Sequence, residues 1–445
     1  MTIFKAYDIR GTVPDQIDDT LARKIGQAFV TLTKARRIAV GRDMRVSSPV
    51  LAEALIDGAR AAGADVLEVG MVSTPMLNFA VAANKLDGGI QVTASHNPGA
   101  YNGFKLCGPG ASPVSYDSGI GDVERWVASK AGAFQPAARR GGLEKREIFD
   151  EYSRFLKAQV KLADRHLRLI ADSANGVTGV REFLILEELY PDIEGMFLEP
   201  DGSFPNHEAN PLIPENIRPL QDRVHATGAD LGIAFDGDGD RVAFVDNEGK
   251  AVSGDMITAL IAASELGRHA GATVLYDLRS SRAVKEEIEH LGGVAKKCRV
   301  GHSFIKQMMR ETGAVLAGEL SGHFYFKDNF YLDSGIFAAL RVLEILSHSE
   351  KTMAQLVAPL DRYHRSGEIN FRVRDQDAVL ARVEQAFRGR GEASHLDGLS
   401  VDFEDWWFNL RKSNTEPLLR INLEASSEDV MRQRLTELQA LLAEA

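Results

Sequence analysis

Residues 37–43 read Arg-Ile-Ala-Val-Gly-Arg-Asp, and this stretch decides the fold class of the chain. Its apolar centre predicts a buried strand. A polar turn follows, then an amphipathic segment at 49–62, and then a second apolar run at 65–70. The stretch and its neighbours therefore predict a strand–helix–strand unit of an α/β domain.

The same order returns twice more along the chain, beginning at 167–173 and at 273–281. Because the pattern occurs three times, we predict three related mixed α/β domains. In the first and third copies, serines stand where a helix N-cap is expected and glycines stand where the helix stops. These residues are Ser47, Ser48 and Gly63, and Ser280, Ser281, Gly292 and Gly293.

The chain from about Arg365 has a different pattern and predicts a smaller α+β domain. Its strands are expected at 369–373, 399–403, 406–410 and 418–423, and its helices at 377–387 and 427–443. Residues 135–142 contain proline and two glycines and predict a linker. The predicted fold class is α/β, with domains at 1–145, 146–250, 251–364 and 365–445.

Composition limits the classes of function. The chain has 445 residues, too many for one hydrophobic core, and a net charge of −11, which argues against nucleic-acid or anionic-membrane partners. An acidic protein can still bind phosphate where basic groups converge. Cys107 and Cys298 have no zinc-site spacing, and we see neither a signal peptide nor a membrane-spanning run. We expect a cytoplasmic protein.

The first chemically informative loop is 93–98, Thr-Ala-Ser-His-Asn-Pro, which follows the apolar run 88–92. This order places Ser95 at the exposed end of a strand. Ser95 is then either a nucleophile or an ordinary cap in a polar turn. Lys105 follows closely and can supply positive charge to the same site.

The second loop is 236–241, Asp-Gly-Asp-Gly-Asp-Arg, between two apolar runs that predict a hairpin. Asp236, Asp238 and Asp240 repel one another, so a divalent cation, Mg²⁺ or Ca²⁺, is the natural compensator. An EF-hand is excluded because Arg241 stands where its glycine is required. The alternative is a solvated Asp-Gly turn. Arg241 beside the carboxylates suggests a phosphate contact.

Two further loops suit a phosphorylated sugar. In 318–323, Gly-Glu-Leu-Ser-Gly-His, we expect Glu319 and Ser321 to face the same way in extended chain and to bind adjacent hydroxyls. The loop could equally be a simple turn. In the loop that begins at Arg411, one guanidinium and several polar groups suit a phosphate dianion, although hairpin loops are often polar. Its other members are Ser413, Asn414 and Thr415.

In this order the four loops resemble the α-D-phosphohexomutase superfamily, and the resemblance runs from residue 5 to residue 422. Residues 7–11, Tyr-Asp-Ile-Arg-Gly, and the loop 318–323 are similar to the bacterial phosphomannomutase/phosphoglucomutase branch. The phosphoglucosamine branch typically has Gln between the Glu and the Ser. The chain lacks the Walker, Gly-x-Gly-x-x-Gly and His-Glu-x-x-His motifs of other classes.

The resemblance implies four domains around a central cleft and an intramolecular phosphotransferase of the isomerase class. It implies a phosphoserine at Ser95, which with the three aspartates holds Mg²⁺, and a hexose 1,6-bisphosphate as intermediate and activator. It also implies further site positions: Arg10, Lys105, Arg241, His302 and His323 as catalytic residues, and Tyr7, Arg279, Glu319, Ser321, Arg411, Ser413, Asn414 and Thr415 as substrate-binding residues. Arg279 stands where some bacterial members have a lysine.

The expected activity is that of a phosphomannomutase acting on a small phosphosugar, with a phosphoglucomutase or a dual-specificity enzyme as the alternative. His323 and Lys105, and less directly His302, are candidates for proton transfer. A non-catalytic phosphosugar-binding protein would need the Arg411 loop but neither Ser95 nor the aspartates. We expect a monomer or a homodimer.

Overall fold

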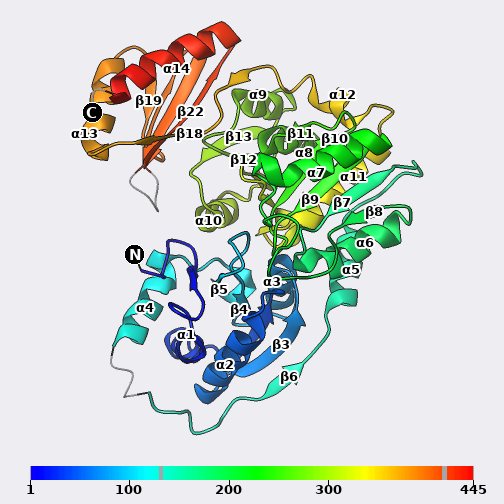
Figure 1. The fold of residues 1–445 in the computed structure, drawn as a ribbon, viewed down its shortest axis with the longest axis vertical. Coiled ribbons are helices and arrows are strands. Elements are labelled where there is room, and N and C mark those ends of the chain that lie inside the picture. Colours follow the sequence, from blue (N-terminus) through cyan, green and yellow to red (C-terminus); the bar gives the residue numbers. More distant parts are fainter. Residues whose placement is uncertain (1, 130–133, 413–417, 444–445) are drawn as a thin grey trace.

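The computed structural model describes residues 2–129, 134–412 and 418–443. Figure 1 shows the chain as successive units, from blue at the N-terminus to red at the C-terminus. Each unit is built on one sheet with its own helices. Within the described ranges, no helix is long and apolar enough to cross a membrane.

The first unit has the sheet order β1-β5-β4-β2-β3-β6. Its strands are β1 (Ile9–Thr12), β2 (Arg37–Arg42), β3 (Asp65–Met71), β4 (Gly88–Val92), β5 (Tyr101–Cys107) and β6 (Leu143–Lys145). Its helices are α1 (Asp19–Thr33), α2 (Ser48–Ala61), α3 (Thr74–Ala83) and α4 (Gly121–Ala128).

The second unit has the order β11-β10-β9-β7-β8, and the third has β13-β12-β14-β15-β16. The second comprises α5 (Phe149–Ala158), β7 (Leu169–Asp172), α6 (Glu182–Leu189), β8 (Glu194–Met196), α7 (Pro214–Thr227), β9 (Leu231–Phe235), β10 (Val242–Asp246) and β11 (Ala251–Val252). The third comprises α8 (Gly254–Arg268), β12 (Thr273–Asp277), α9 (Arg282–His290), β13 (Val294–Cys298), α10 (His302–Thr312), β14 (Leu316–Gly318), β15 (Phe324–Phe326), β16 (Leu332–Asp333), α11 (Gly335–Ser347) and α12 (Met353–Val357).

The first three sheets repeat one arrangement of strands. A central strand (β2, β7 or β12) pairs in parallel with the strand that follows it (β3, β8 or β13) on one side. On its other side it pairs in parallel with β4, β9 or β14. That strand then pairs antiparallel with β5, β10 or β15. This repeat confirms the three related mixed α/β units predicted from the sequence.

The fourth unit is an antiparallel sheet with helices, as predicted, and lies beside α9 in Figure 1. The backbone N–H of Arg282 in α9 donates to Glu424 of this unit at 3.0 Å. Its elements are β17 (His364–Arg365), β18 (Ile369–Arg372), α13 (Gln376–Phe387), β19 (Glu392–Ser394), β20 (Leu399–Asp402), β21 (Trp406–Lys412), β22 (Leu418–Ala425) and α14 (Glu428–Ala443).

Strand pairing suggests where two of the domain boundaries lie. The pairing of β6 with β3 supports a first unit that runs to residue 145. The pairing of β11 with β10 ties residues 251–252 to the second sheet. We therefore propose that the second unit ends after Val252 and not at residue 250.

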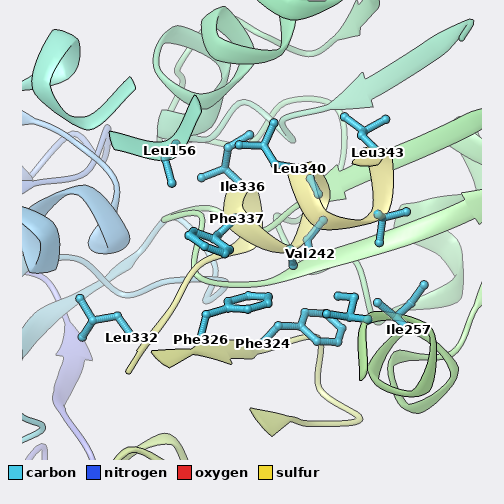
Figure 2. Packing of buried hydrophobic residues seen from close by; sticks show 14 of the residues in the cluster. Leu156, Val242, Ile257, Phe324, Phe326, Leu332, Ile336, Phe337, Leu340 and Leu343 are labelled. Carbon is cyan, nitrogen blue, oxygen red and sulfur yellow. The ribbon is translucent and has the colours of Figure 1, made fainter. Parts of the chain in front are cut away.

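Helix α11 lies at the centre of the largest apolar cluster. Figure 2 shows Ile336, Phe337 and Leu340 of this helix among side chains from other elements. The ring of Phe337 packs against that of Phe326 with centroids 4.5 Å apart. The same cluster contains Leu156 of the second unit and residues of α3 in the first, so burial of apolar surface joins the three α/β units.

Of the serines predicted to cap helices, Ser281 caps α9 as expected, whereas Ser47 does not cap α2. The Ser281 hydroxyl accepts a hydrogen bond from the Ala283 N–H and caps α9. Ser47 precedes α2 but makes no side-chain cap, because its backbone already has helical dihedrals (φ −82°, ψ −15°), and its hydroxyl accepts from the Asn102 side chain at 2.8 Å. Gly63 and Gly292 follow the two helices with positive φ, as expected for helix stops.

Helices α1 and α2 pack closely through glycines. A Cβ on Gly58 would lie 2.0 Å from the Arg23 carbonyl oxygen. We predict that Gly58→Ala destabilises the protein by about 1–3 kcal/mol, because overpacking outweighs the better helix propensity of alanine. Urea denaturation measures this change. Gly267→Ala in α8, where a Cβ meets open space, is the control and should not destabilise. Equal stability of Gly58→Ala and wild type would contradict the close crossing.

Candidate active site

The three informative loops of the α/β units occupy the same place in the repeated arrangement. Each follows the strand paired in parallel with the centre (β4, β9 or β14) and leads into its antiparallel partner. The middle loop, 236–241, contacts both of the others. A Cβ on Gly237 would lie 2.6 Å from the Ser95 carbonyl oxygen, and Arg241 forms an isolated antiparallel bridge with His323.

Ser95 is buried, with 2% of its surface exposed, so the expectation of an exposed hydroxyl is wrong. The aspartate turn of the second unit covers it. The Ser95 hydroxyl donates to Asp236 Oδ2 at 2.8 Å and lies 3.1 Å from His96 Nδ1. Its backbone has a φ of 51°, in the left-handed region, and its N–H donates to the Thr93 hydroxyl at 2.9 Å. A non-glycine residue held in this conformation is typical of functional sites.

Asp236, Asp238 and Asp240 are all buried, and their carboxylate oxygens lie within 4.8 Å of one another. Burial and the two neighbouring carboxylates raise the pKa of Asp236 well above its ordinary value. Burial alone would also raise the pKa of Asp240, but Lys105 and His323 hold that pKa well below its ordinary value.

The turn is hydrogen-bonded from the first unit. The Thr74 hydroxyl donates to Asp238 Oδ2 at 2.6 Å. The Lys105 ammonium lies 2.7 Å from the same oxygen and 2.5 Å from Asp240 Oδ2. Among the described residues, Oδ1 of Asp238 and Oδ1 of Asp240 have no hydrogen-bond donor. Oxygen ligands with unused lone pairs in a closely spaced acidic group fit a hard divalent cation.

The cationic side chains take distinct positions around this turn. Burial alone would lower the pKa of Lys105, but Asp238 and Asp240 raise it above its ordinary value, so this side chain is charged. Arg241 Nε lies 3.3 Å from His323 Nε2, whose own distance to Asp240 Oδ1 is 3.4 Å. Arg10 donates to the Asn97 side chain at 2.6 Å, beside the Ser95 loop.

His302 and Tyr7 meet across the first and third units. His302 is the first residue of α10, and its ring centroid lies 5.4 Å from that of Tyr7. Burial lowers the pKa of His302 well below its ordinary value, and the positive charges of Lys306 and Lys105 act in the same direction. The imidazole is therefore neutral near pH 7 and can accept a proton.

Of the two conformations considered for the third loop, the structure shows the turn and not the extended chain. Residues 319–322 form a turn, closed by a hydrogen bond from the Gly322 N–H to the Glu319 carbonyl, and Gly322 has a φ of 83°. The Glu319 carboxylate accepts from the Tyr325 hydroxyl and from the Gly301 N–H. The Ser321 hydroxyl instead lies 3.1 Å from His323 Nδ1.

Arg279 and Arg411 lie outside the Ser95 cluster but near the third loop. Asp277 accepts hydrogen bonds from Arg279 and from the backbone N–H of Leu320, so it joins Arg279 to that loop. Arg411 forms an ion pair with Glu368 at 2.7 Å. Glu368, Arg279 and Ser321 line one cavity of about 660 Å³. Ser413, Asn414 and Thr415 fall outside the described residues.

Sequence reasoning missed three residues of the site. His96 stands in the first loop and only its contact with Ser95 reveals it. Thr74 begins α3 and bonds an aspartate 164 positions away. Arg45 follows β2 and donates to the backbone of the Ser95 loop. None of the three carried a local signal, because the partners of Arg45 and Thr74 are distant in sequence and His96 looks like any polar residue of a turn.

Comparison with known proteins agrees with this arrangement. Four sequence families match in order: phosphoglucomutase/phosphomannomutase alpha/beta/alpha domain I at 1–125, domain II at 150–249, domain III at 253–363 and the C-terminal domain at 368–441. A phosphomannomutase of Methanocaldococcus jannaschii is 38% identical over 100% of this chain and 98% of its own length. A phosphomannomutase/phosphoglucomutase of Pseudomonas putida is 39% identical over 98% of this chain and 94% of its own.

A solved structure agrees as well. The crystal structure of a phosphoglucomutase/phosphomannomutase family protein from Burkholderia thailandensis superposes with a TM-score of 0.91, at 34% identity, over 99% of this chain and 98% of that one. The family profiles, the sequence relatives and the solved structure therefore all point to the same protein family. The chain belongs to the phosphoglucomutase/phosphomannomutase family of the α-D-phosphohexomutase superfamily.

Proposed function

We propose that this enzyme is a phosphomannomutase that interconverts mannose 6-phosphate and mannose 1-phosphate through a phosphorylated Ser95. The observation that carries the proposal is the buried hydroxyl of Ser95, 2.8 Å from a carboxylate of the three-aspartate turn. A binding protein would need neither a buried serine hydroxyl nor a second unit that supplies three carboxylates beside it. Relatives named phosphomannomutase and phosphomannomutase/phosphoglucomutase support the same activity.

The proposed reaction has two phosphoryl transfers. In the first, the bond between phosphorus and the Ser95 oxygen breaks and a bond to the free C1 or C6 hydroxyl oxygen of the sugar forms. That hydroxyl loses its proton and the Ser95 oxygen gains one, so protons balance. The resulting hexose 1,6-bisphosphate turns around. In the second transfer the other phosphorus–sugar oxygen bond breaks, that phosphorus bonds to the Ser95 oxygen, and the proton lost by the Ser95 hydroxyl passes to the freed sugar oxygen. We propose that His302 or His323 moves the proton, because both imidazoles lie beside the cluster.

Phosphoryl transfer needs positioning and charge neutralisation more than covalent chemistry. Asp236, Asp238 and Asp240 would hold Mg²⁺ together with a Ser95 oxygen, and the bound ion would neutralise charge on the phosphoryl group. Lys105, Arg241 and Arg10 supply fixed positive charge from two sides. The donors are in place before the reaction, so little reorganisation is needed.

The sugar must bind in two orientations, so its ring and its non-reacting phosphate need a site that accepts both. We propose Glu319 and Ser321 as contacts for ring hydroxyls. We propose the loop from Arg411 to Thr415, with Arg279 and Tyr7, as contacts for the remote phosphate. We expect a monomer or homodimer in the cytoplasm that binds a small phosphosugar, with neither nucleic-acid nor membrane partners.

A phosphoglucomutase or a dual-specificity enzyme is the second candidate. Mannose and glucose differ at the C2 hydroxyl, and the double name of the P. putida relative favours considering both sugars. Coupled assays with mannose 1-phosphate and glucose 1-phosphate, run side by side on one preparation, decide between them.

Ser95→Ala should abolish turnover, because the variant lacks the oxygen that carries the phosphoryl group. The fold should persist. The loss of the hydroxyl leaves Asp236 Oδ2 without this donor and costs about 1–3 kcal/mol. Intact mass and peptide mapping after incubation with hexose 1,6-bisphosphate should find a phosphoryl group on Ser95 of the wild type and none at that position in the variant. A variant that retains a sizeable fraction of wild-type activity would exclude the phosphoserine mechanism.

Asp238→Asn should weaken Mg²⁺ binding by about tenfold or more, because the affinity of an oxygen-ligand site depends on its count of charged ligands. Isothermal titration calorimetry measures the affinity, and EDTA should silence the wild type. Asp246→Asn is the matched control, since this buried carboxylate lies on the same hairpin and accepts from the turn at 248–250. Unchanged affinity in Asp238→Asn would remove the aspartate turn as the metal site.

Arg411→Lys should weaken binding of the 1-phosphate and the 6-phosphate alike, because we assign this loop to whichever phosphate is not reacting. Lysine keeps the charge but loses the two-pronged donor, and a charge-assisted hydrogen bond contributes about 1.5–3 kcal/mol, so affinity should fall roughly tenfold to a hundredfold. Apparent affinities for both isomers, with activating bisphosphate saturating, give the comparison. A large loss for one isomer alone would refute the shared phosphate site.

A further inference from the structure

Arg45 binds the Ser95 loop through four backbone carbonyl groups. One terminal nitrogen of its guanidinium donates to the carbonyl of Ser95 at 2.9 Å and to that of Asn97 at 2.5 Å. The other donates to the carbonyl of Pro98 at 2.8 Å and to that of Tyr101 at 2.9 Å. Only 1% of the Arg45 surface is exposed. All the N–H donors of the guanidinium therefore bond to protein acceptors and not to solvent.

The guanidinium is itself oriented from two units. Its Nε donates to Asp43 Oδ2 at 3.2 Å, and the other oxygen of Asp43 accepts from the Arg45 N–H and the Ser48 hydroxyl. From the second unit, the ring of Phe204 lies 5.1 Å from the guanidinium carbon. A Cβ on Gly202 would lie 2.6 Å from the Arg45 Cα. These contacts restrict Arg45 to one orientation.

The loop needs such a partner because its conformation is not one that a serine prefers. Ser95 has a φ of 51°, and its carbonyl oxygen is directed at Arg45 and against Gly237. Several buried carbonyl oxygens that converge on one point require donors arranged in a plane. Arginine supplies such a fork, whereas the ammonium of lysine is a point donor that cannot reach all four acceptors.

We propose that Arg45 is a positioning residue that fixes the backbone of the Ser95 loop and so aims the Ser95 hydroxyl at the aspartate turn. The inference rests on the proposed function, because the hydroxyl it aims is the proposed phosphoryl carrier. Arg45 bonds the loop backbone, not Ser95 Oγ, so it acts through Ser95. It should therefore control the rate of phosphoryl transfer and not the affinity for the sugar.

The test compares Arg45→Lys and Arg45→Met with the wild type. The rate of Ser95 phosphorylation by hexose 1,6-bisphosphate is followed by intact mass, and kcat and KM are measured with the hexose 1-phosphate. Misplacement of a reacting group by about 1 Å can cost about a hundredfold in rate, so we expect Arg45→Lys to lose roughly tenfold to a hundredfold in phosphorylation rate and kcat, with KM nearly unchanged. Arg45→Met should lose more, because it also leaves the carbonyls without donors.

Arg341→Lys is the matched control. This buried arginine also pairs with carboxylates and a backbone carbonyl, but those belong to Glu265, Glu344 and Gln159, away from the Ser95 loop. The Arg341→Lys substitution should lower the melting temperature, but it should not reduce the phosphorylation rate as much as Arg45→Lys does. A rate of Ser95 phosphorylation in Arg45→Lys equal to that of the wild type would overturn the proposal. So would a loss of phosphorylation rate in Arg341→Lys as large as that in Arg45→Lys.

The experiment also separates failure of this inference from failure of the proposed function. If neither Arg45 variant folds, Phe204→Leu, which loosens the guanidinium without removing it, decides the question: a reduced phosphorylation rate supports the proposal and an unchanged rate overturns it. If the wild type accepts no phosphoryl group from the bisphosphate, the proposed function fails. If the wild type is phosphorylated and the Arg45 variants are phosphorylated equally fast, only the inference about Arg45 fails.

Discussion

The architecture of the site depends on one electrostatic constraint, the burial of three carboxylates within 4.8 Å of one another. Such a turn is unfavourable unless positive charge and hydrogen-bond donors surround it. The first unit supplies hydroxyl donors from Ser95 and Thr74 and the ammonium of Lys105, and the third unit places the His323 imidazole 3.4 Å from Asp240 Oδ1. The aspartate turn therefore explains why three separately built sheets meet at one point.

The repeated strand order explains how they can meet. The loops that carry the serine, the aspartates and Glu319 all lead from a strand parallel to the sheet centre into its antiparallel neighbour. One backbone arrangement thus presents a hydroxyl, a carboxylate cluster and a polar turn from three units. The apolar cluster around α11 holds these units together, so the geometry of the loops rests on packing behind them (Figure 2).

The sequence could predict the elements but not the contacts among them. Apolar runs identified the strands, and the dense aspartates identified the candidate metal loop without any long-range information. The burial of Ser95 depends on Asp236, which lies 141 positions away, and no local pattern encodes that contact. The sequence left the loop at 319–322 open between extended chain and a turn, because an alternation of side chains says nothing about the positive φ of Gly322. Arg45 was missed for the same reason as Thr74, since the acceptors of both are distant in sequence.

Burial acts on two candidate proton carriers with opposite outcomes. It disfavours the charged form of both Lys105 and His302, but only Lys105 has carboxylates at 2.5 and 2.7 Å that restore its charge. His302 instead faces the positive charges of Lys306 and Lys105, which deepen the effect of burial. A charged lysine has no lone pair for a proton, whereas a neutral imidazole has one. The environment therefore leaves Lys105 as a fixed cation beside the aspartate turn and His302 as a neutral imidazole, which are the states that the proposed roles of a cation and a proton acceptor require.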